Sequence, residues 1–278
     1  MAAREDVSKS NQHRALGLST VAFTACFAVW TIFSIIGVAI KDELSLTEFE
    51  FGLLVATPIL TGSLTRLVLG VWTERFGGRI VFPLQMLLAA FATWLLTLAD
   101  TYTMYLVAAL GIGLAGGSFI IGVAYVSRWF PVGRQGTALG VFGAGNVGAA
   151  VTKFVAPFVM VAYGWQGVAN VWAAALAIIA VLFFLLAKDE PELVERRKSG
   201  AKAPGFAEQF APLKKLQVWR FSLYYFFVFG AFVAIALWTP HYLIAVYEVD
   251  ITTAGMAAAA FSLSASLFRA YGGHLSDR

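Results

Sequence analysis

The sequence has 278 residues, of which 59% are hydrophobic and only 13% are charged, and its mean hydropathy is +0.77. A soluble domain carries about 25% charged residues, so this composition excludes an ordinary soluble domain and indicates an integral membrane protein. The net charge of +4 is no nucleic-acid signature, and the single cysteine, Cys26, excludes a disulfide or a cysteine metal cluster within one chain.

Eight apolar runs are long enough to cross a bilayer as helices, which takes about 20 residues each. We place them at residues 17–40, 52–72, 80–98, 104–127, 137–160, 167–187, 219–240 and 253–273. Residues 188–218 break this pattern with three prolines and mixed charge. The sequence therefore predicts an all-α polytopic membrane protein with a six-helix half (1–187), a linker (188–218) and the start of a second half (219–278).

The basic residues are distributed unequally between the two sides of the predicted spans. Sixteen of the 20 Lys and Arg residues lie on one side, Lys41 alone lies on the other, and Arg66, Lys153 and Arg269 lie inside spans. The positive-inside rule then places the N-terminus and the linker in the cytoplasm of a multi-pass plasma (inner) membrane protein. The charge run of the linker is most simply a solvated loop, and attraction to anionic lipid headgroups is the alternative.

Two stretches of the chain repeat each other at an offset of 203 residues. Residues 45–75 and 248–278 match without gaps at eight positions, including Arg66 with Arg269, and Glu74 matches Asp277 in charge. Most of the shared positions fall on one helix face, which carries the arginine. Repeats of this kind are typical of a two-half transporter with its site between the halves. We therefore expect a C-terminally incomplete chain, because only two of six spans follow the linker.

An arginine inside a membrane span needs a partner, since its insertion costs about 2.5–3.5 kcal/mol. All 16 Asp and Glu residues fall in connections, tails or span edges. We therefore favour an anionic substrate over a structural ion pair as the partner of Arg66 and Arg269. The planar guanidinium matches a planar oxyanion with two parallel hydrogen bonds and stays charged at any relevant pH.

Two short motifs resemble a family signature. Residues 70–79, GVWTERFGGR, resemble the loop between the second and third helices of the major facilitator superfamily, and residues 273–278, GHLSDR, resemble its second-half copy. We expect an acidic side chain and loop arginines of this motif to latch neighbouring helices on the cytoplasmic side. The motif residues are Gly70, Glu74, Arg75, Gly77, Arg79, Gly273, Asp277 and Arg278.

Two glycine-rich stretches, GIGLAGGSFIIG at 111–122 and GVFGAGNVGAAVTKFVAP at 140–157, are similar to those of the nitrate/nitrite porter family. The resemblance implies a transporter whose anion is held by Arg66 and Arg269, with Phe119, Asn146 and Tyr225 beside them. It leaves open whether Tyr224 replaces Tyr225, and which first-helix ring takes part (Phe27, Trp30 or Phe33). Tight helix packing is the other interpretation of the glycines.

The transport mechanism has two interpretations. Repulsion between two unliganded arginines favours nitrate/nitrite exchange, whereas a titratable Lys153 favours nitrate/proton symport; Lys153 also suits a water-filled cavity or a backbone carbonyl. Alternatives are a porter for another small anion (formate, oxalate or a phosphate ester), a membrane sensor, or an inactive fragment. We expect no enzyme activity, catalytic residue, metal or cofactor. The expected partners are a small inorganic anion and the lipid bilayer, with no nucleic acid and no obligate protein partner.

Overall fold

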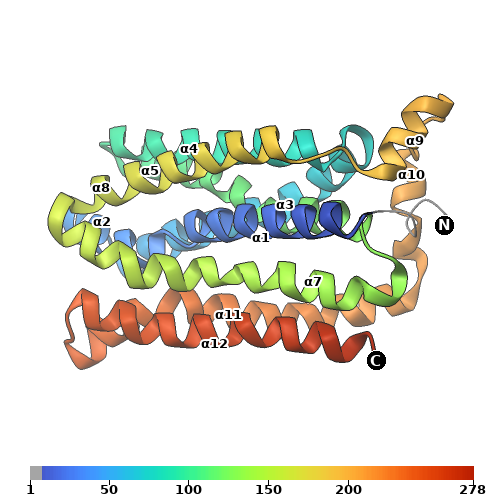
Figure 1. Ribbon diagram of the computed structural model, residues 1–278. Coiled ribbons are helices and arrows are strands. Elements are labelled where there is room, and N and C mark those ends of the chain that lie inside the picture. The colour runs from blue at the N-terminus through green and yellow to red at the C-terminus, as the bar shows by residue number, and fades with distance from the viewer. Residues whose placement is uncertain (1–7) are drawn as a thin grey trace.

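The computed structural model describes residues 8–278, apart from the side chain of Phe206. Seven helical runs in this range are long and apolar enough to cross a membrane, and one of them, residues 132–186, turns back at Gly164, where φ is 71° (Figure 1). This run holds two of the predicted spans, so the all-α polytopic fold is confirmed. Residues 1–7, the start of the predicted first half, lie outside the described part of the chain.

The first six spans precede the linker and the last two follow it. The helices before the linker are α1 (Lys9–Trp30), α2 (Phe33–Leu44), α3 (Glu48–Phe76), α4 (Gly78–Leu95), α5 (Tyr102–Ile112), α6 (Ser118–Ser127), α7 (Gln135–Gly143) and α8 (Gly148–Leu186). The linker contains α9 (Pro191–Ser199) and α10 (Phe206–Gln209), and the last spans are α11 (Leu216–Tyr247) and α12 (Ile251–Ser276). The start of α1, the end of α12, α9 and α10 lie at one end of the bundle, called the linker end here (Figure 1).

The glycine-rich stretches form short 3-10 segments inside the fourth and fifth spans. Gly113–Gly117 joins α5 to α6, and Ala144–Val147 joins α7 to α8. These segments lie close to other spans: a Cβ on Gly62 of α3 would lie 3.1 Å from the Cα of Gly116. The glycines therefore serve close helix packing, as one of the two interpretations of the sequence proposed.

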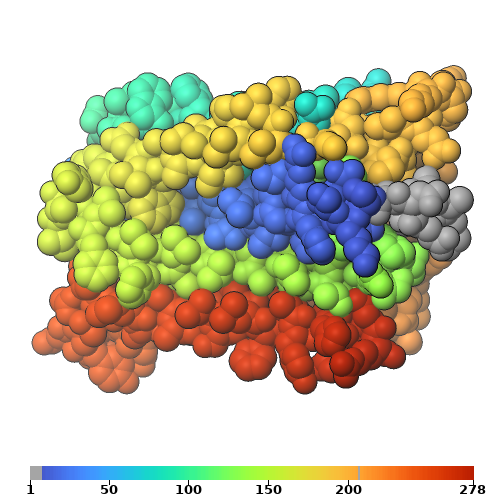
Figure 2. All heavy atoms as spheres, in the orientation of Figure 1, coloured from blue at the N-terminus to red at the C-terminus, as the bar shows by residue number. Residues whose placement is uncertain are grey.

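Helix α12 packs along α7 and the first part of α8, and Figure 2 shows the atoms of α12 in a row directly below those of α7 and the start of α8. Glycines allow this approach, because a Cβ on Gly140 would lie 2.9 Å from the Cα of Gly273. At the linker end the Asp277 carboxylate accepts hydrogen bonds from the backbone N–H groups of Gly136 (2.8 Å) and Thr137 (2.6 Å). Asp277 therefore caps the first turn of α7 and ties α12 to the first six spans.

The linker differs from the predicted solvated loop. Its first part forms α9, in which Leu193 is buried, and the preceding Glu190 has no exposed surface. The sequence lacks apolar periodicity here because α9 is held by one apolar side chain and several polar contacts. The charge run is therefore partly docked against the bundle.

We predict that Asp277→Asn separates α7 from α12 at the linker end. Hydrogen bonds from the side chain and backbone of Thr137 hold the pKa of Asp277 below its ordinary value. The Asp277 cap therefore contributes its full stability at pH values above the ordinary carboxyl pKa. This stability is lost as the pH falls through the lowered pKa of Asp277. Spin labels at Arg134→Cys and Ser276→Cys should show a several-fold larger separated population in Asp277→Asn at neutral pH.

The matched control for this variant is Asp250→Asn. Asp250 accepts hydrogen bonds from Thr252 and Thr253 at the opposite end of α12, so its loss should leave the linker end unchanged. Equal label distances in wild type and Asp277→Asn would contradict the proposed role of the cap.

Candidate functional site

Arg66 lies in the middle of α3, against the fourth span and the first. Its Nε donates a hydrogen bond to the carbonyl oxygen of Gly116 (3.2 Å), and its Cζ lies 5.9 Å from the ring centroid of Trp30. The indole Nε1 of Trp30 donates to the carbonyl oxygen of Pro58 (2.8 Å), and a Cβ on Gly116 would lie 2.6 Å from the indole ring. Among the first-helix rings that the sequence left open, Trp30 is therefore the one placed over Arg66.

Arg269 of α12 lies beside the same rings as Arg66. The Cζ of Arg269 is 5.7 Å from the ring centroid of Phe119 and 5.6 Å from that of Phe229, and the Cζ of Arg66 is 5.9 Å and 5.8 Å from them. The Nη1 of Arg269 is buried and has no hydrogen-bond partner in residues 8–278. The two repeated arginines thus come together around one pair of aromatic faces, each at cation–π distance.

Two residues of α11 complete this aromatic group. The Tyr225 ring stacks on Phe229 with centroids 5.0 Å apart and lies 6.2 Å from Phe119, whereas Tyr224 points outward and is 61% exposed. The hydroxyl of Tyr225 is buried without a partner in the described chain. Phe229 was missed by the sequence reasoning; its position four residues after Tyr225, on the same helix face, was the signal for it.

Asn146 lies near this group rather than in it. It belongs to the 3-10 segment before α8, is 2% exposed, and its Oδ1 has no hydrogen-bond partner in the described residues. Gly143, one turn earlier, lies against the Arg269 guanidinium, since a Cβ there would be 3.6 Å from Nε. Asn146 makes no hydrogen bond to either arginine within residues 8–278.

A cavity of about 500 Å³ opens between α3 and α11, and Trp30, Arg66, Tyr225 and Phe229 contribute to its wall. Neither Arg66 nor Arg269 has a carboxylate within ion-pair distance in the described part of the chain. The arrangement therefore places the Arg66 guanidinium at the wall of this cavity and the Arg269 guanidinium beside the same Phe119 and Phe229 rings, and Arg269 has a nitrogen without a partner among the described residues. Chemically, such a site suits a small anion.

Lys153 lies apart from the arginines, at the contact between α8 and α12. Its side chain has no exposed surface, and within residues 8–278 its Nζ donates only to the carbonyl oxygen of Ala149, 3.1 Å away on the same helix. A Cβ on Gly255 of α12 would clash with the Lys153 carbonyl. Lys153 follows Asn146 by seven residues, about 10 Å along a helix.

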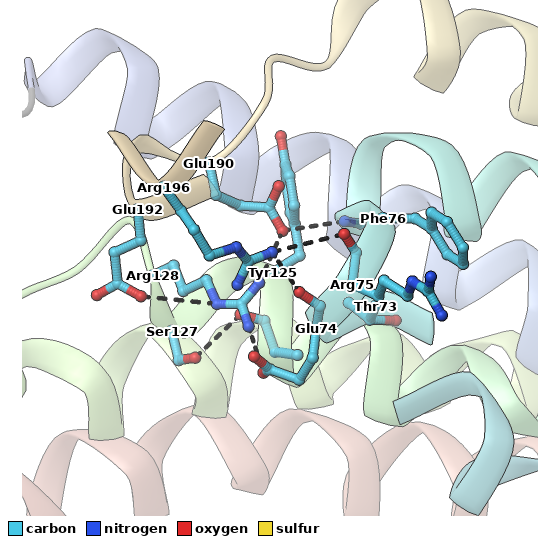
Figure 3. Close-up of polar contacts among 12 residues, drawn as sticks. Thr73, Glu74, Arg75, Phe76, Tyr125, Ser127, Arg128, Glu190, Glu192 and Arg196 are labelled. Atoms are coloured by element: carbon cyan, nitrogen blue, oxygen red, sulfur yellow. Dashed lines mark hydrogen bonds and ion pairs between the residues drawn. The ribbon is translucent and has the colours of Figure 1, made fainter. Parts of the chain in front are cut away.

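The first copy of the loop motif forms a polar cluster at the linker end (Figure 3). Glu74 pairs with Arg128, which follows α6, and Arg128 also lies 3.3 Å from a carboxylate oxygen of Glu190 and 3.8 Å from one of Glu192. Arg196 of α9 donates to the backbone carbonyl of Glu74 (2.6 Å). We call Glu74, Arg128, Glu190, Glu192 and Arg196 the linker-end cluster.

The two loop arginines make different contacts. Arg75 lies over the ring of Phe76 on its own helix (5.4 Å), whereas Arg79 lies over the Phe184 ring (5.5 Å) and donates to the Phe184 carbonyl (3.5 Å), which joins α4 to α8. Arg128 and Arg196 make further bridging contacts. The sequence did not indicate either residue, because their partners lie far away in the chain.

The other motif residues have backbone roles. Gly77 has φ of 88° between α3 and α4, a left-handed conformation that favours glycine. Gly70 faces Ile120, and Gly273 lies against α7 beside the Asp277 cap. The backbone N–H of Arg278 donates to the Leu275 carbonyl (3.3 Å) after the end of α12.

Comparison with known proteins places these features in a family. Residues 18–278 match the Major Facilitator Superfamily. The chain is 39% identical over 289 residues to a probable nitrate/nitrite antiporter, NarK1, of Thermus thermophilus, a match that covers 99% of this chain and 64% of the relative. It is 32% identical over 269 residues to the nitrite extrusion protein of Bacillus subtilis (strain 168), covering 97% and 66%.

Solved structures agree on the fold. A bacterial homologue of the human lysosomal transporter Spinster, in an inward-facing and unoccupied conformation, matches with a TM-score of 0.74 at 19% identity, over 93% of this chain and 61% of that chain. At this identity the likeness supports the fold alone. The chain spans about two thirds of the length of the curated relatives it matches. The chain therefore belongs to the major facilitator superfamily and is related to its nitrate/nitrite transporters, as the match over residues 18–278 and the identity to these relatives show.

Proposed function

We propose that this protein is a secondary transporter that moves nitrate, nitrite or both by alternating access, with the anion held between Arg66 and Arg269. The observation that carries the proposal is the convergence of both guanidiniums on Phe119 and Phe229 without a carboxylate partner in residues 8–278. The names of the relatives supply the choice of anion. The linker end is then the cytoplasmic end, as the distribution of Lys and Arg predicts.

The chemistry of the guanidinium supports a planar oxyanion as the substrate. Each arginine presents parallel N–H donors in one plane, and two such forks approaching from opposite helices match the oxygens of nitrate or nitrite. The ring faces of Phe119 and Phe229 offset part of the cost of burying the charges but accept few of the N–H groups. The donors therefore remain available, and the rings limit the size of the anion.

Two further polar groups complete the proposed site. The Tyr225 hydroxyl and the Asn146 amide are buried and each holds an atom without a protein partner in the described chain. A buried polar group is costly unless it is hydrogen-bonded. The Tyr225 hydroxyl can donate to an anion oxygen. The unpartnered Oδ1 of Asn146 is an acceptor, so Asn146 would donate to the anion through its amide Nδ2; we assign both residues supporting roles beside the arginines.

Charge repulsion supports exchange of one anion for another. Without an anion, closure around the site brings two like charges together in a medium of low dielectric constant, where repulsion is strong. A bound anion relieves this repulsion, so the loaded protein should change its access side more readily than the empty one. The proposed consequence is obligatory exchange of nitrate and nitrite.

Lys153 supports proton symport as the second mechanism. Its ammonium is fully buried and contacts only a backbone carbonyl on its own helix, without a carboxylate in ion-pair range among the described residues. Desolvation disfavours the charged form of a buried lysine, which makes proton release and uptake possible during transport.

We expect Arg66→Lys and Arg269→Lys each to reduce nitrate uptake by about tenfold to a hundredfold, the effect of losing one charge-assisted hydrogen bond. Lysine keeps the charge but loses the planar fork. Uptake of labelled nitrate into proteoliposomes measures the effect. Arg220→Lys, at the exposed start of α11, is the control that should transport like wild type. Wild-type uptake by both site variants would refute the clamp.

For exchange, we expect uptake of external nitrate to depend on the contents of the liposome. Vesicles loaded with nitrite should take up nitrate many times faster than vesicles loaded with an impermeant anion. Internal nitrite can bind the site and relieve the repulsion between the two arginines, so the transporter can turn back to the outside. Initial rates at zero membrane potential give the comparison. Equal rates under both loadings would count against exchange.

For symport, we expect Lys153→Gln to abolish nitrate uptake driven by a proton gradient while nitrate/nitrite exchange continues. Glutamine keeps a similar length and a hydrogen-bond donor but cannot titrate. Parallel measurements of both modes in the same proteoliposomes separate a coupling role from a folding defect. If proton-driven uptake survives in the variant, Lys153 is not the coupling group.

A further inference from the structure

The Glu190 carboxyl is the most buried acid of the linker-end cluster. It has no exposed surface, whereas the side chains of Glu74 and Glu192 are 33% and 41% exposed. Its Oε1 accepts hydrogen bonds from the N–H of Gly78 (2.9 Å) and from Nη1 of Arg128 (3.3 Å). Its Oε2 is buried and has no hydrogen-bond partner in residues 8–278.

The surroundings of this second oxygen are apolar. A Cβ built on Gly77 would lie 2.9 Å from Oε2 and would also meet the side chain of the buried Leu193. An ionised carboxylate oxygen in such a place has no hydrogen-bond donor among residues 8–278. The neutral acid is much cheaper to bury, because the cost of desolvating a charge far exceeds that of a hydroxyl.

The charges of the neighbouring elements also favour a proton here. The Arg128 guanidinium lies within ion-pair distance of both Glu74 and Glu190. The other nearby cations and the tyrosine are engaged elsewhere: Arg196 with the Glu74 carbonyl, Arg197 with Asp189, and the Tyr125 hydroxyl with the Lys188 carbonyl. Glu74 and Glu190 both face the Arg128 guanidinium, so a proton on Glu190 reduces the repulsion between these two carboxylates.

We propose that Glu190 is a proton-binding site, protonated while α9 is docked on the α3–α4 connection, and that its ionisation releases α9. Burial raises the pKa of the Glu190 carboxyl above its usual value, although the Gly78 N–H and Arg128 act in the opposite direction. Because docked Glu190 holds its proton more tightly than solvent-exposed Glu190, docking is favoured at low pH. It is lost as the pH rises through the raised pKa.

Release of α9 would change the tether between the first six spans and the last two. When α9 is docked, Arg196 donates to the Glu74 carbonyl and Arg197 donates to the Phe76 carbonyl. Both carbonyls lie in the last turn of α3, and the C-terminal end of a helix attracts cations. Only residues 200–215 then connect this anchor to α11. Undocking lengthens the free connection and loosens the restraint on α11 and α12. This pH-dependent docking of α9 does not depend on which anion is transported. With the linker end in the cytoplasm, as proposed above, it responds to cytoplasmic pH.

Spin labels on the full chain in nanodiscs test this inference directly. Ser199→Cys at the end of α9 and Ile80→Cys at the start of α4 are both exposed, and the native Cys26 is buried. Between about pH 5 and pH 9, wild type should show one short distance at low pH and a growing longer population as the pH rises. Glu190→Gln, which imitates the protonated acid, should keep the short distance throughout.

The matched control is Glu195→Gln, an exposed carboxylate on the same helix, which should respond to pH like wild type. Trypsin cleavage after Arg197 gives a second readout: it should accelerate with pH in wild type and stay slow in Glu190→Gln. A wild-type distance that is constant over this range would overturn the inference. So would a Glu190→Gln protein that titrates like wild type, or one in which α9 is released at every pH.

Discussion

A guanidinium that is buried in a membrane protein is stable only where other groups replace its hydration shell. In this chain two kinds of group do so, aromatic rings and carboxylates. Arg66 has one backbone carbonyl and three ring faces, and Arg269 has two ring faces and one nitrogen without a partner in the described residues. Arg128, at the linker end, has three carboxylates. Ring faces stabilise a cation without using up its N–H donors, so the two arginines inside the spans keep both their charge and their hydrogen-bonding capacity.

Close packing is what brings the rings and the guanidiniums together. The Trp30 ring fits against Gly116, and its indole N–H is satisfied by the Pro58 carbonyl, so the ring has a fixed place beside Arg66. A larger residue at position 116 would displace the ring and the carbonyl that Arg66 contacts. The packing role of this glycine-rich stretch therefore also sets where the Trp30 ring and the Gly116 carbonyl lie beside Arg66.

Much of the fold was predictable because span length, hydropathy and the repeat of Arg66 at Arg269 are properties of short sequence windows. The choice of Tyr225 over Tyr224, and the presence of Phe229, depend on the rotation of α11, which a helix that is apolar on all sides does not reveal. The docking of α9 was not predictable for another reason. Glu190 and Arg128 are 62 residues apart, and polar contacts leave no periodic pattern in the sequence.

Helices α3 and α12 carry an arginine and a carboxylate at the same spacing, but the two carboxylates bind different parts of the structure. In each helix a carboxylate follows the arginine by eight residues, about 12 Å, with Glu74 after Arg66 and Asp277 after Arg269. Glu74 pairs within the first six spans, whereas Asp277 crosses to the start of α7. On the proposed mechanism, an anion that draws both arginines together acts on a helix whose end is paired within the first six spans (α3) and on one whose end crosses to them (α12). The contact between α12 and α7 can therefore open without breaking the first six spans apart, because Asp277 is its polar tie at the linker end and Glu74 has its partner within the first six spans.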